Sequence, residues 1–153
     1  MKKITPNLWF DHNAHEAVDF YLGVFPDSKI VSTMYYPEST EEGLPDFQKE
    51  FAGKVLSIEF ELSGNRFVAI NAGPEFTFNE SVSFSVPCKD QKEIDYYWEK
   101  LSSVKESEQC GWLKDKYGLS WQIVPENVEE LMKNPGAFEV MMQQKKIILA
   151  EYT

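Results

Sequence analysis

The feature that most constrains the fold of this chain is a short pattern that occurs once in each half. Residues 13–21 have the sequence NAHEAVDFY, and residues 90–97 have the sequence DQKEIDYY. Each copy begins with Asn or Asp and has Glu three residues later, which is typical of a helix start, where side chains bind otherwise unpaired backbone N–H groups. Each copy also follows a strand-like run. The repeat therefore predicts a strand and helix unit used twice, with a site between two similar halves.

Composition and charge limit the partners of the chain. Its 153 residues suit one domain, and it contains no apolar run approaching the ~20 residues of a membrane helix. A net charge of −10 would repel phosphate backbones and anionic lipids, so we expect neither nucleic acid nor membrane as a partner. No apolar signal sequence follows Lys2 and Lys3, which favours a cytoplasmic protein. In that compartment Cys88 and Cys110 are expected to be free thiols.

Periodicity and turn residues predict the elements of the first half. The expected order is strand, helix and three strands, with an exposed loop before the last two strands. The strands are expected at residues 4–11, 28–36, 54–62 and 66–72, the helix at 14–25 and the loop at 37–53.

The second half repeats this order less clearly. Alternating residues at 81–86 predict a strand, residues 91–101 a helix, and residues 107–114 and 119–124 a hairpin around Asp115–Gly118. Helical sequence follows at 128–144, interrupted at Pro135–Gly136. The fourth strand of this half is expected at residues 146–150.

Four stretches of sequence resemble one branch of a known superfamily. They are ITPNLWFD (4–11), VPCKDQ (86–91), QCGWLKD (109–115) and SWQIVP (120–125). They resemble the PhnB-like branch, often labelled 3-demethylubiquinone-9 3-methyltransferase, of the glyoxalase/bleomycin-resistance/dioxygenase superfamily, whose members are also called vicinal oxygen chelate proteins. This resemblance implies an α+β fold: a single glyoxalase-like domain, 1–153, in which two βαβββ modules (1–78 and 79–153) form a curved mixed sheet with helices outside. It also implies a cup between the modules and a homodimer.

The resemblance does not carry metal or methyltransferase chemistry to this chain. Metal-dependent relatives have His and Glu ligands at positions that correspond here to Pro6, Ala69, Ser81 and Gln122, which are poor or impossible ligands for a transition metal. A methyltransferase would need a parallel sheet with a glycine-rich turn, whereas the strands here are expected to be antiparallel and no such turn occurs. We therefore expect no metal and no cofactor.

Strand alternation suggests which residues line the cup. Ser81, Ser83 and Ser85 share one face of their strand, and Ser120 and Val124 share a face with Gln122, whereas Leu119, Trp121 and Ile123 are directed to the core. Phe67, Ala69 and Asn71 are expected to face the cup from the other module. The resulting ligand-binding candidates are Phe10, Ser57, Asn71, Ser83, Ser85, Cys110, Trp112 and Gln122. The alternative is that these small polar residues only cover a solvated sheet face.

Two residues are candidates for catalysis. Glu59 would be a general base if apolar neighbours raised its pKa, and Cys110, expected on one strand face with Trp112, would be a nucleophile. The alternatives are a solvated charge for Glu59 and core packing for Cys110. His12 and His15 are interpreted as surface residues, because companion metal ligands are absent from their neighbourhood in the sequence.

Three functions are consistent with these patterns. The first is metal-free binding of a small organic molecule in the cup. The second is an enzyme that uses acid–base chemistry through Glu59, Gln122 or Cys110. The third is sequestration of a cationic antibiotic, which an acidic surface would favour.

Overall fold

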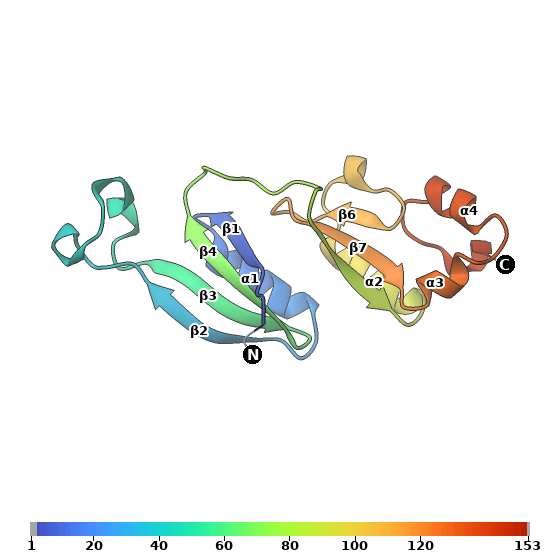
Figure 1. Ribbon diagram of the computed structural model, residues 1–153, viewed down its shortest axis with the longest axis horizontal. Helices are drawn as coiled ribbons and strands as arrows, with labels where there is room; N and C mark the ends of the chain where they lie inside the picture. The colour runs from blue at the N-terminus through green and yellow to red at the C-terminus, as the bar shows by residue number, and fades with distance from the viewer. Residues whose placement is uncertain (1–2, 153) are drawn as a thin grey trace. The chain divides into compact units, whose positions relative to one another are not determined.

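The structure is a computed structural model that describes residues 3–152. The chain divides into two compact units, residues 1–77 (unit 1) and 78–153 (unit 2), and each is described by itself. Figure 1 labels the helices and strands of both units.

Unit 1 has the predicted order of one strand, one helix and three strands. Its elements are β1 (Asn7–Asp11), α1 (Ala14–Val24), β2 (Lys29–Tyr35), the short 3₁₀ helices η1 (Thr40–Glu42) and η2 (Asp46–Phe51), β3 (Val55–Leu62) and β4 (Asn65–Ala72). The strands form one sheet in the order β1-β4-β3-β2. Strands β1 and β4 are parallel, and the other pairs are antiparallel.

Helix α1 covers one face of this sheet (Figure 1). On that face Ile58 pairs with Ala69 and Phe60 with Phe67, and all four side chains are buried. The buried side of α1 supplies Ala14, Ala17, Val18, Tyr21 and Val24. We call the opposite side the open face of unit 1; it carries Trp9, Ser57, Glu59, Glu61, Arg66, Val68 and Ile70.

Unit 2 contains a smaller sheet and more helical structure. Its elements are β5 (Ser83–Cys88), α2 (Gln91–Leu101), η3 (Lys105–Ser107), β6 (Trp112–Lys114), β7 (Ser120–Pro125), α3 (Val128–Leu131), α4 (Ala137–Gln143) and η4 (Leu149–Tyr152). The strand order is β5-β7-β6, with β5 and β7 parallel and β6 and β7 antiparallel. Helix α2 packs against the face with Val86, Leu113 and Ile123, which are buried. The opposite side is the open face of unit 2.

The fourth strand predicted for the second half at residues 146–150 is wrong. The end of this segment enters η4, and Ile147 is fully buried. The Gln91 side chain of α2 explains the difference, because its amide donates to the Ile147 carbonyl at 2.9 Å and accepts from Leu149 N–H at 2.8 Å. The segment is thereby held on α2, and its backbone groups are not available to a sheet edge.

An irregular segment runs along the outer edge of β6. In unit 1 the equivalent position, beside β3, is occupied by the edge strand β2. Ser103 N–H donates to the Lys114 carbonyl at 2.9 Å, and Gln109 N–H donates to the Trp112 carbonyl at 3.1 Å. Between them lies η3, which interrupts a regular ladder. Unit 2 is therefore a βαββ module with a three-stranded sheet.

Three smaller expectations also differ from the structure. The strands are not all antiparallel, since each sheet contains one parallel pair. The strand expected at 107–114 is only Trp112–Lys114, because Cys110 and Gly111 have positive φ and form a turn. The helical segment expected at 128–144 forms α3 and α4, with Gly136 at φ 79° before α4.

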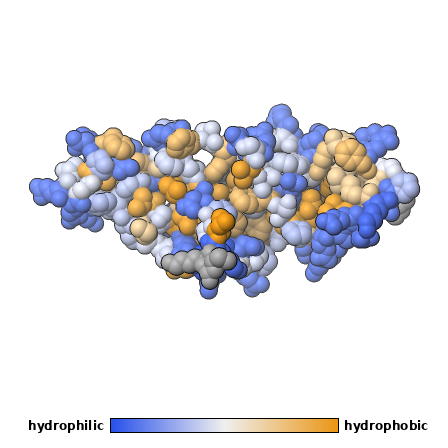
Figure 2. Space-filling model, viewed as in Figure 1, coloured by the Kyte–Doolittle hydropathy of each residue, from blue (hydrophilic) through white to orange (hydrophobic). Residues whose placement is uncertain are grey.

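Hydrophobic residues reach the surface of both units (Figure 2). The most exposed large ones include Met34, Tyr35, Phe47, Phe76 and Phe138. In the part of the chain that the structure describes, no helix has the length and apolar character needed to cross a membrane.

Candidate functional site

The open face of unit 2 brings together four of the predicted ligand-binding residues. The sheet register places Ser85 and Trp112 on either side of Gln122, and Ser83 lies two residues before Ser85. Gln122 Nε2 donates to Ser83 Oγ at 2.9 Å, which fixes the orientation of the amide. Ser85 is exposed, and Trp112 and Gln122 are half-buried. Hydroxyls, an amide and an indole on one sheet face can orient a small organic molecule.

The prediction that Phe67, Ala69 and Asn71 face the cup is wrong. The register of β3 and β4 puts Phe67 and Ala69 on the face covered by α1, where Phe67 stacks on Phe60 at 5.6 Å. The ligand-binding candidates Asn71 and Phe10, neighbours on β4 and β1, also lie on this covered side, and the prediction for Phe10 is wrong because its side chain is only 2% exposed. Because side chains alternate along a strand, an error of one residue exchanges the two faces completely.

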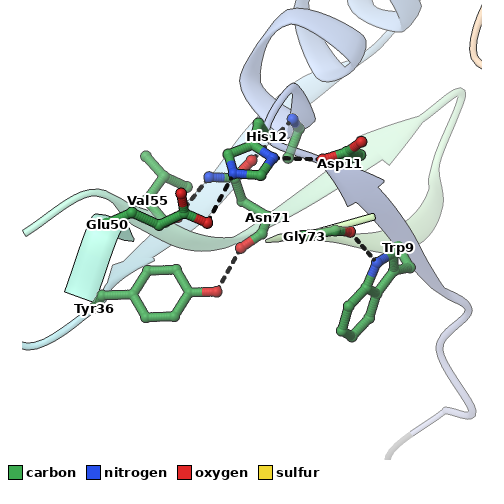
Figure 3. Close-up of polar contacts among 9 residues, drawn as sticks. Trp9, Asp11, His12, Tyr36, Glu50, Val55, Asn71 and Gly73 are labelled. Carbon is green, nitrogen blue, oxygen red and sulfur yellow. Dashed lines mark hydrogen bonds and ion pairs between the residues drawn. The ribbon is translucent and has the colours of Figure 1, made fainter. Parts of the chain in front are cut away.

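Asn71 has a structural role that occupies its side chain. Its Oδ1 accepts from Ala14 N–H at the start of α1 at 3.2 Å, and its Nδ2 donates to the Val55 carbonyl at 3.0 Å. The Tyr36 hydroxyl donates to the Asn71 backbone carbonyl at 2.6 Å (Figure 3). Asn71 thus connects the helix with two neighbouring parts of the sheet.

Three residues that are not among the predicted ligand-binding candidates lie on the open face of unit 1. Trp9, Val68 and Ile70 are half-buried there, and the predicted candidate Ser57 lies opposite Ile70. Trp9 Nε1 donates to the Gly73 carbonyl at 2.9 Å, and its ring contacts Phe76 edge-on at 4.8 Å. The alternation of Trp9 with buried Leu8 and Phe10 is the signal that could have identified it.

Glu59 lies on the open face but is engaged in a charge network. Arg66 donates to Glu59 Oε1 and to Glu61 Oε1, each at 3.1 Å, and Ser32 Oγ donates to Glu59 Oε2 at 3.1 Å. The hydrogen bond from Arg66 lowers the pKa of Glu61. Glu59 therefore lies beside a guanidinium and a hydroxyl, and not in the apolar surroundings that a general base at this position would need.

Cys110 does not lie on a strand face with Trp112. It is at the first central position of a two-residue turn, with φ 54°, and its Sγ is 3.7 Å from Met142 Sδ of α4. The other thiol, Cys88, is 1% exposed, and burial raises its pKa to about 12. Both cysteines are free, and only Cys110 is partly accessible.

The four positions that correspond to metal ligands do not fit a metal ion. Ala69 is fully buried and has no donor atom, and the Pro6 carbonyl accepts from Val68 N–H at 2.9 Å. Ser81 Oγ donates to Asn79 Oδ1 at 2.6 Å, and Gln122 binds Ser83. Within residues 3–152, no group of three or more His, Cys, Asp or Glu side chains is arranged to hold a metal.

Unit 1 also contains a depression of about 440 Å³ near the start of α1. The residues that line it come from α1 and its start, from the ends of β2 and β4, and from the beginning of β3: His12, Asn13, His15, Glu16, Tyr35, Gly53, Lys54, Val55 and Asn71. His12 and His15, interpreted from sequence as surface residues, are both exposed here. None of the other lining residues except Asn71 was singled out from sequence as a candidate.

A βαβββ unit and a βαββ unit, each with its helix on one sheet face, define a protein of the glyoxalase, or vicinal oxygen chelate, fold. The sequence profile of the 3-demethylubiquinone-9 3-methyltransferase family matches residues 2–124, and the chain belongs to this family. It is a PhnB-like member of the vicinal oxygen chelate superfamily, as the four sequence stretches predicted.

Solved structures agree with this assignment. A PhnB protein from Bacillus cereus is 35% identical, with a TM-score of 0.63, and the match covers 81% of this chain and 99% of that chain. A Pseudomonas aeruginosa protein is 16% identical, with a TM-score of 0.56 and coverages of 82% and 98%. The fosfomycin resistance protein FosX from Mesorhizobium loti shares the fold at 10% identity, with a TM-score of 0.54 and coverages of 86% and 97%. The search of curated proteins found no match.

Proposed function

We propose that this protein binds a small organic molecule, without a metal ion, through the open face of unit 2. The observation that carries the proposal is the hydrogen bond between Gln122 and Ser83 beside Ser85 and Trp112. It holds the amide in one orientation before any ligand arrives, so less side-chain entropy is lost on binding.

The chemistry of this face suggests what the ligand looks like. Gln122 Oε1 accepts a hydrogen bond, and the Ser85 hydroxyl donates or accepts one. The half-buried Trp112 offers an aromatic ring for a planar or cationic group. These groups suit a neutral or cationic molecule with a flat portion and at least one polar substituent.

Metal-dependent chemistry and methyl transfer are not part of the proposal. The residues at the ligand positions of metal-dependent relatives supply either no side-chain donor or neutral oxygens, which bind transition metals weakly. The turn between β1 and α1 is His12-Asn13, which lacks the glycines that a dinucleotide-type cofactor site needs. We infer that the family's name does not describe the chemistry of this chain.

Native mass spectrometry and a binding screen test the proposal. The purified protein is examined for a carried molecule and for bound metal, and is then screened by melting shift against neutral and cationic aromatic compounds, including cationic antibiotics. A compound that raises the melting temperature is measured by calorimetry on Ser85→Ala and Gln122→Ala, which we expect to weaken binding about five- to tenfold each.

Matched controls keep this test specific. Ser103→Ala and Gln143→Ala change exposed residues of the same types outside the open face, and should leave affinity unchanged. Equal losses in all four variants would contradict the assignment of the site. A tightly bound transition metal in the mass spectrum would contradict the metal-free proposal.

The same screen separates the alternatives. Conversion of a bound compound, abolished by Cys110→Ser or Glu59→Gln, would make the protein an enzyme, and unchanged turnover would exclude those roles. Binding of cationic antibiotics alone would favour sequestration. We further propose a homodimer, for which the stoichiometry in the native mass spectrum is the direct test.

A further inference from the structure

The connection between β2 and β3 forms a flap, residues 37–53, that shares a small core with the residues at its base. Tyr36, Leu44 and Phe51 are buried together, and Ala52 and Leu56 pack against them. At the neck of the flap, Tyr36 N–H donates to the Lys54 carbonyl at 2.8 Å, and Gly53 N–H donates to the Pro37 carbonyl at 3.1 Å. The flap is therefore a folded element with a narrow base.

His12 connects this flap to the junction between β1 and α1. Its ring stacks on Phe51 with centroids 4.8 Å apart, and its Nε2 lies 3.1 Å from Glu50 Oε1. Its Nδ1 is hydrogen-bonded to Asp11 Oδ1, so the ring lies between two carboxylates (Figure 3). His12 has φ 64°, a conformation that is unfavourable for a non-glycine residue and persists only where surrounding contacts favour it.

The protonation state of His12 decides whether both contacts are favourable. A neutral imidazole carries one N–H, so one of its two nitrogens would present a lone pair to a carboxylate. The imidazolium carries two N–H groups and can donate to Asp11 and Glu50 at once. The geometry therefore favours the charged ring.

Several charged or titratable side chains surround His12. Asp11 comes from β1 and Glu50 from η2, while His15, Glu16 and Lys54 line the depression that His12 also lines. The hydrogen bonds to Asp11 and Glu50 raise the pKa of His12 above its ordinary value of 6.5. A raised pKa agrees with a ring that is held in its charged form.

We propose that His12 is a pH-dependent latch that holds the flap against the β1–α1 junction. The latch is strongest where the His12 ring is charged and both carboxylates are ionised, and it is lost as the pH rises through the raised pKa of folded His12. Because His12 and the neck residues Gly53 and Lys54 all line the 440 Å³ depression, release of the flap changes the walls of that depression. A pH above this raised pKa would thus remodel this part of unit 1.

Hydrogen exchange and NMR test the latch on the full chain. Protection factors of amides in residues 44–53, corrected for the intrinsic pH dependence of exchange, are compared at pH 5.5 and pH 8.5. We expect a two- to fivefold loss of protection at high pH, since ion pairs between exposed groups are weak. The ring signals of the chain's two histidines are titrated in parallel to follow His12 directly.

Variants distinguish the latch from a general effect of pH. His12→Gln should abolish the pH dependence. Glu50→Gln should reduce the pH dependence and lower the pKa of His12, and it provides a test that does not rely on correct folding of the His12 variant. His15→Gln is the matched control: it removes the only other histidine, which pairs with Asp19 at 3.1 Å, and should leave the dependence intact. Equal protection at both pH values, or a pH dependence that persists in His12→Gln, would overturn the proposal.

Discussion

Helices α1 and α2 begin with the same sequence pattern but are capped in different ways. At α2, Asp90 Oδ1 accepts from Glu93 N–H at 2.9 Å, and Glu93 reaches back to Lys89 N–H at 3.3 Å. At α1, Asn13 forms no such bond, and its buried Oδ1 has no hydrogen-bond partner among the described residues. The cap is supplied instead by Asn71 of β4. A local pattern thus marks the start of both helices, while the stabilising contact is local in one unit and tertiary in the other.

The two hairpins are also held in different ways. In unit 1, Ser63 and Gly64 form a two-residue turn in which both have positive φ, and Ser63 N–H donates to the exposed Ser28 Oγ at 3.3 Å. In unit 2, the loop of residues 115–118 depends on Asp115, a carboxylate that is 1% exposed. Unit 1 therefore relies on a distant side chain for its helix, and unit 2 relies on a buried side chain for its hairpin.

Asp115→Ala should have the largest effect of the changes considered. Asp115 Oδ1 accepts from Tyr117 N–H at 2.8 Å and Leu119 N–H at 3.1 Å, and Oδ2 accepts from Trp121 Nε1 at 2.9 Å. Removing it leaves buried donors without partners, so we expect a loss of about 3 kcal/mol in the free energy of unfolding. Urea unfolding measures this loss. Asp115→Asn, which keeps one acceptor oxygen, should cost about half as much.

Asn71→Ala should be the most damaging polar change in unit 1. It leaves the Ala14 N–H and the Val55 carbonyl unpaired, and we expect a loss of about 2 kcal/mol in the free energy of unfolding. Urea unfolding, with hydrogen exchange of α1 amides, measures the effect. Asn7→Ala, at an exposed position of β1, is the control and should change stability by less than about 0.5 kcal/mol. Equal losses would show that Asn71 does not support the helix.

The paired caps give a smaller and more selective prediction. Asp90→Ala should cost about 1 kcal/mol, because it removes a cap that is formed, whereas Asn13→Ala should cost less than about 0.5 kcal/mol. The measurement is again urea unfolding of the two variants side by side. A loss at Asn13 as large as that at Asp90 would mean that the two helices are capped alike after all.

Much of the architecture follows from sequence because alternation, breakers and turn residues are local signals. The predicted ends of α1 and α2 agree with the structure to within one residue. In the sheet of unit 2, the side chains of β5 and β7 predicted to face the helix do so. The buried face of β4 is predicted wrongly because both of its faces carry apolar residues. Val68 and Ile70 lie on one face and Phe67 and Ala69 on the other, so alternation cannot choose between them. Only pairing with β3 fixes it.

Other features could not be predicted from local patterns at all. The run of apolar residues at 147–149 is typical of a strand, and its actual conformation depends on the Gln91 side chain far away in sequence. The capping role of Asn71 depends on a contact between β4 and α1. The arrangement of His12 between Asp11 and Glu50 requires the flap to fold back over the β1–α1 junction, which no spacing in the sequence indicates.

The two units should also differ in how their stability depends on pH. This is the smallest of the four effects predicted. Both histidines belong to unit 1, so as the pH falls from 8 to 5.5, protonation of His12 should stabilise unit 1 while leaving unit 2 unchanged. Below about pH 4.5 both units should lose stability, because hydrogen bonds from Arg66 lower the pKa of Glu61 in unit 1, and hydrogen bonds from Lys114 and Lys146 lower those of Glu80 and Asp95 in unit 2.

Hydrogen exchange of α1 and α2 amides across this range measures each unit separately. As the pH falls, protection of α1 should pass through a maximum near pH 5–6, with a change of less than about 1 kcal/mol. Protection of α2 should stay constant down to about pH 4.5 and then decrease. In His12→Gln the rise in α1 protection between pH 8 and 5.5 should disappear, and the decrease in protection below about pH 4.5 should remain. The same profile in both helices of the native protein would mean that the units unfold together, and that the difference in their titrating groups is not expressed locally.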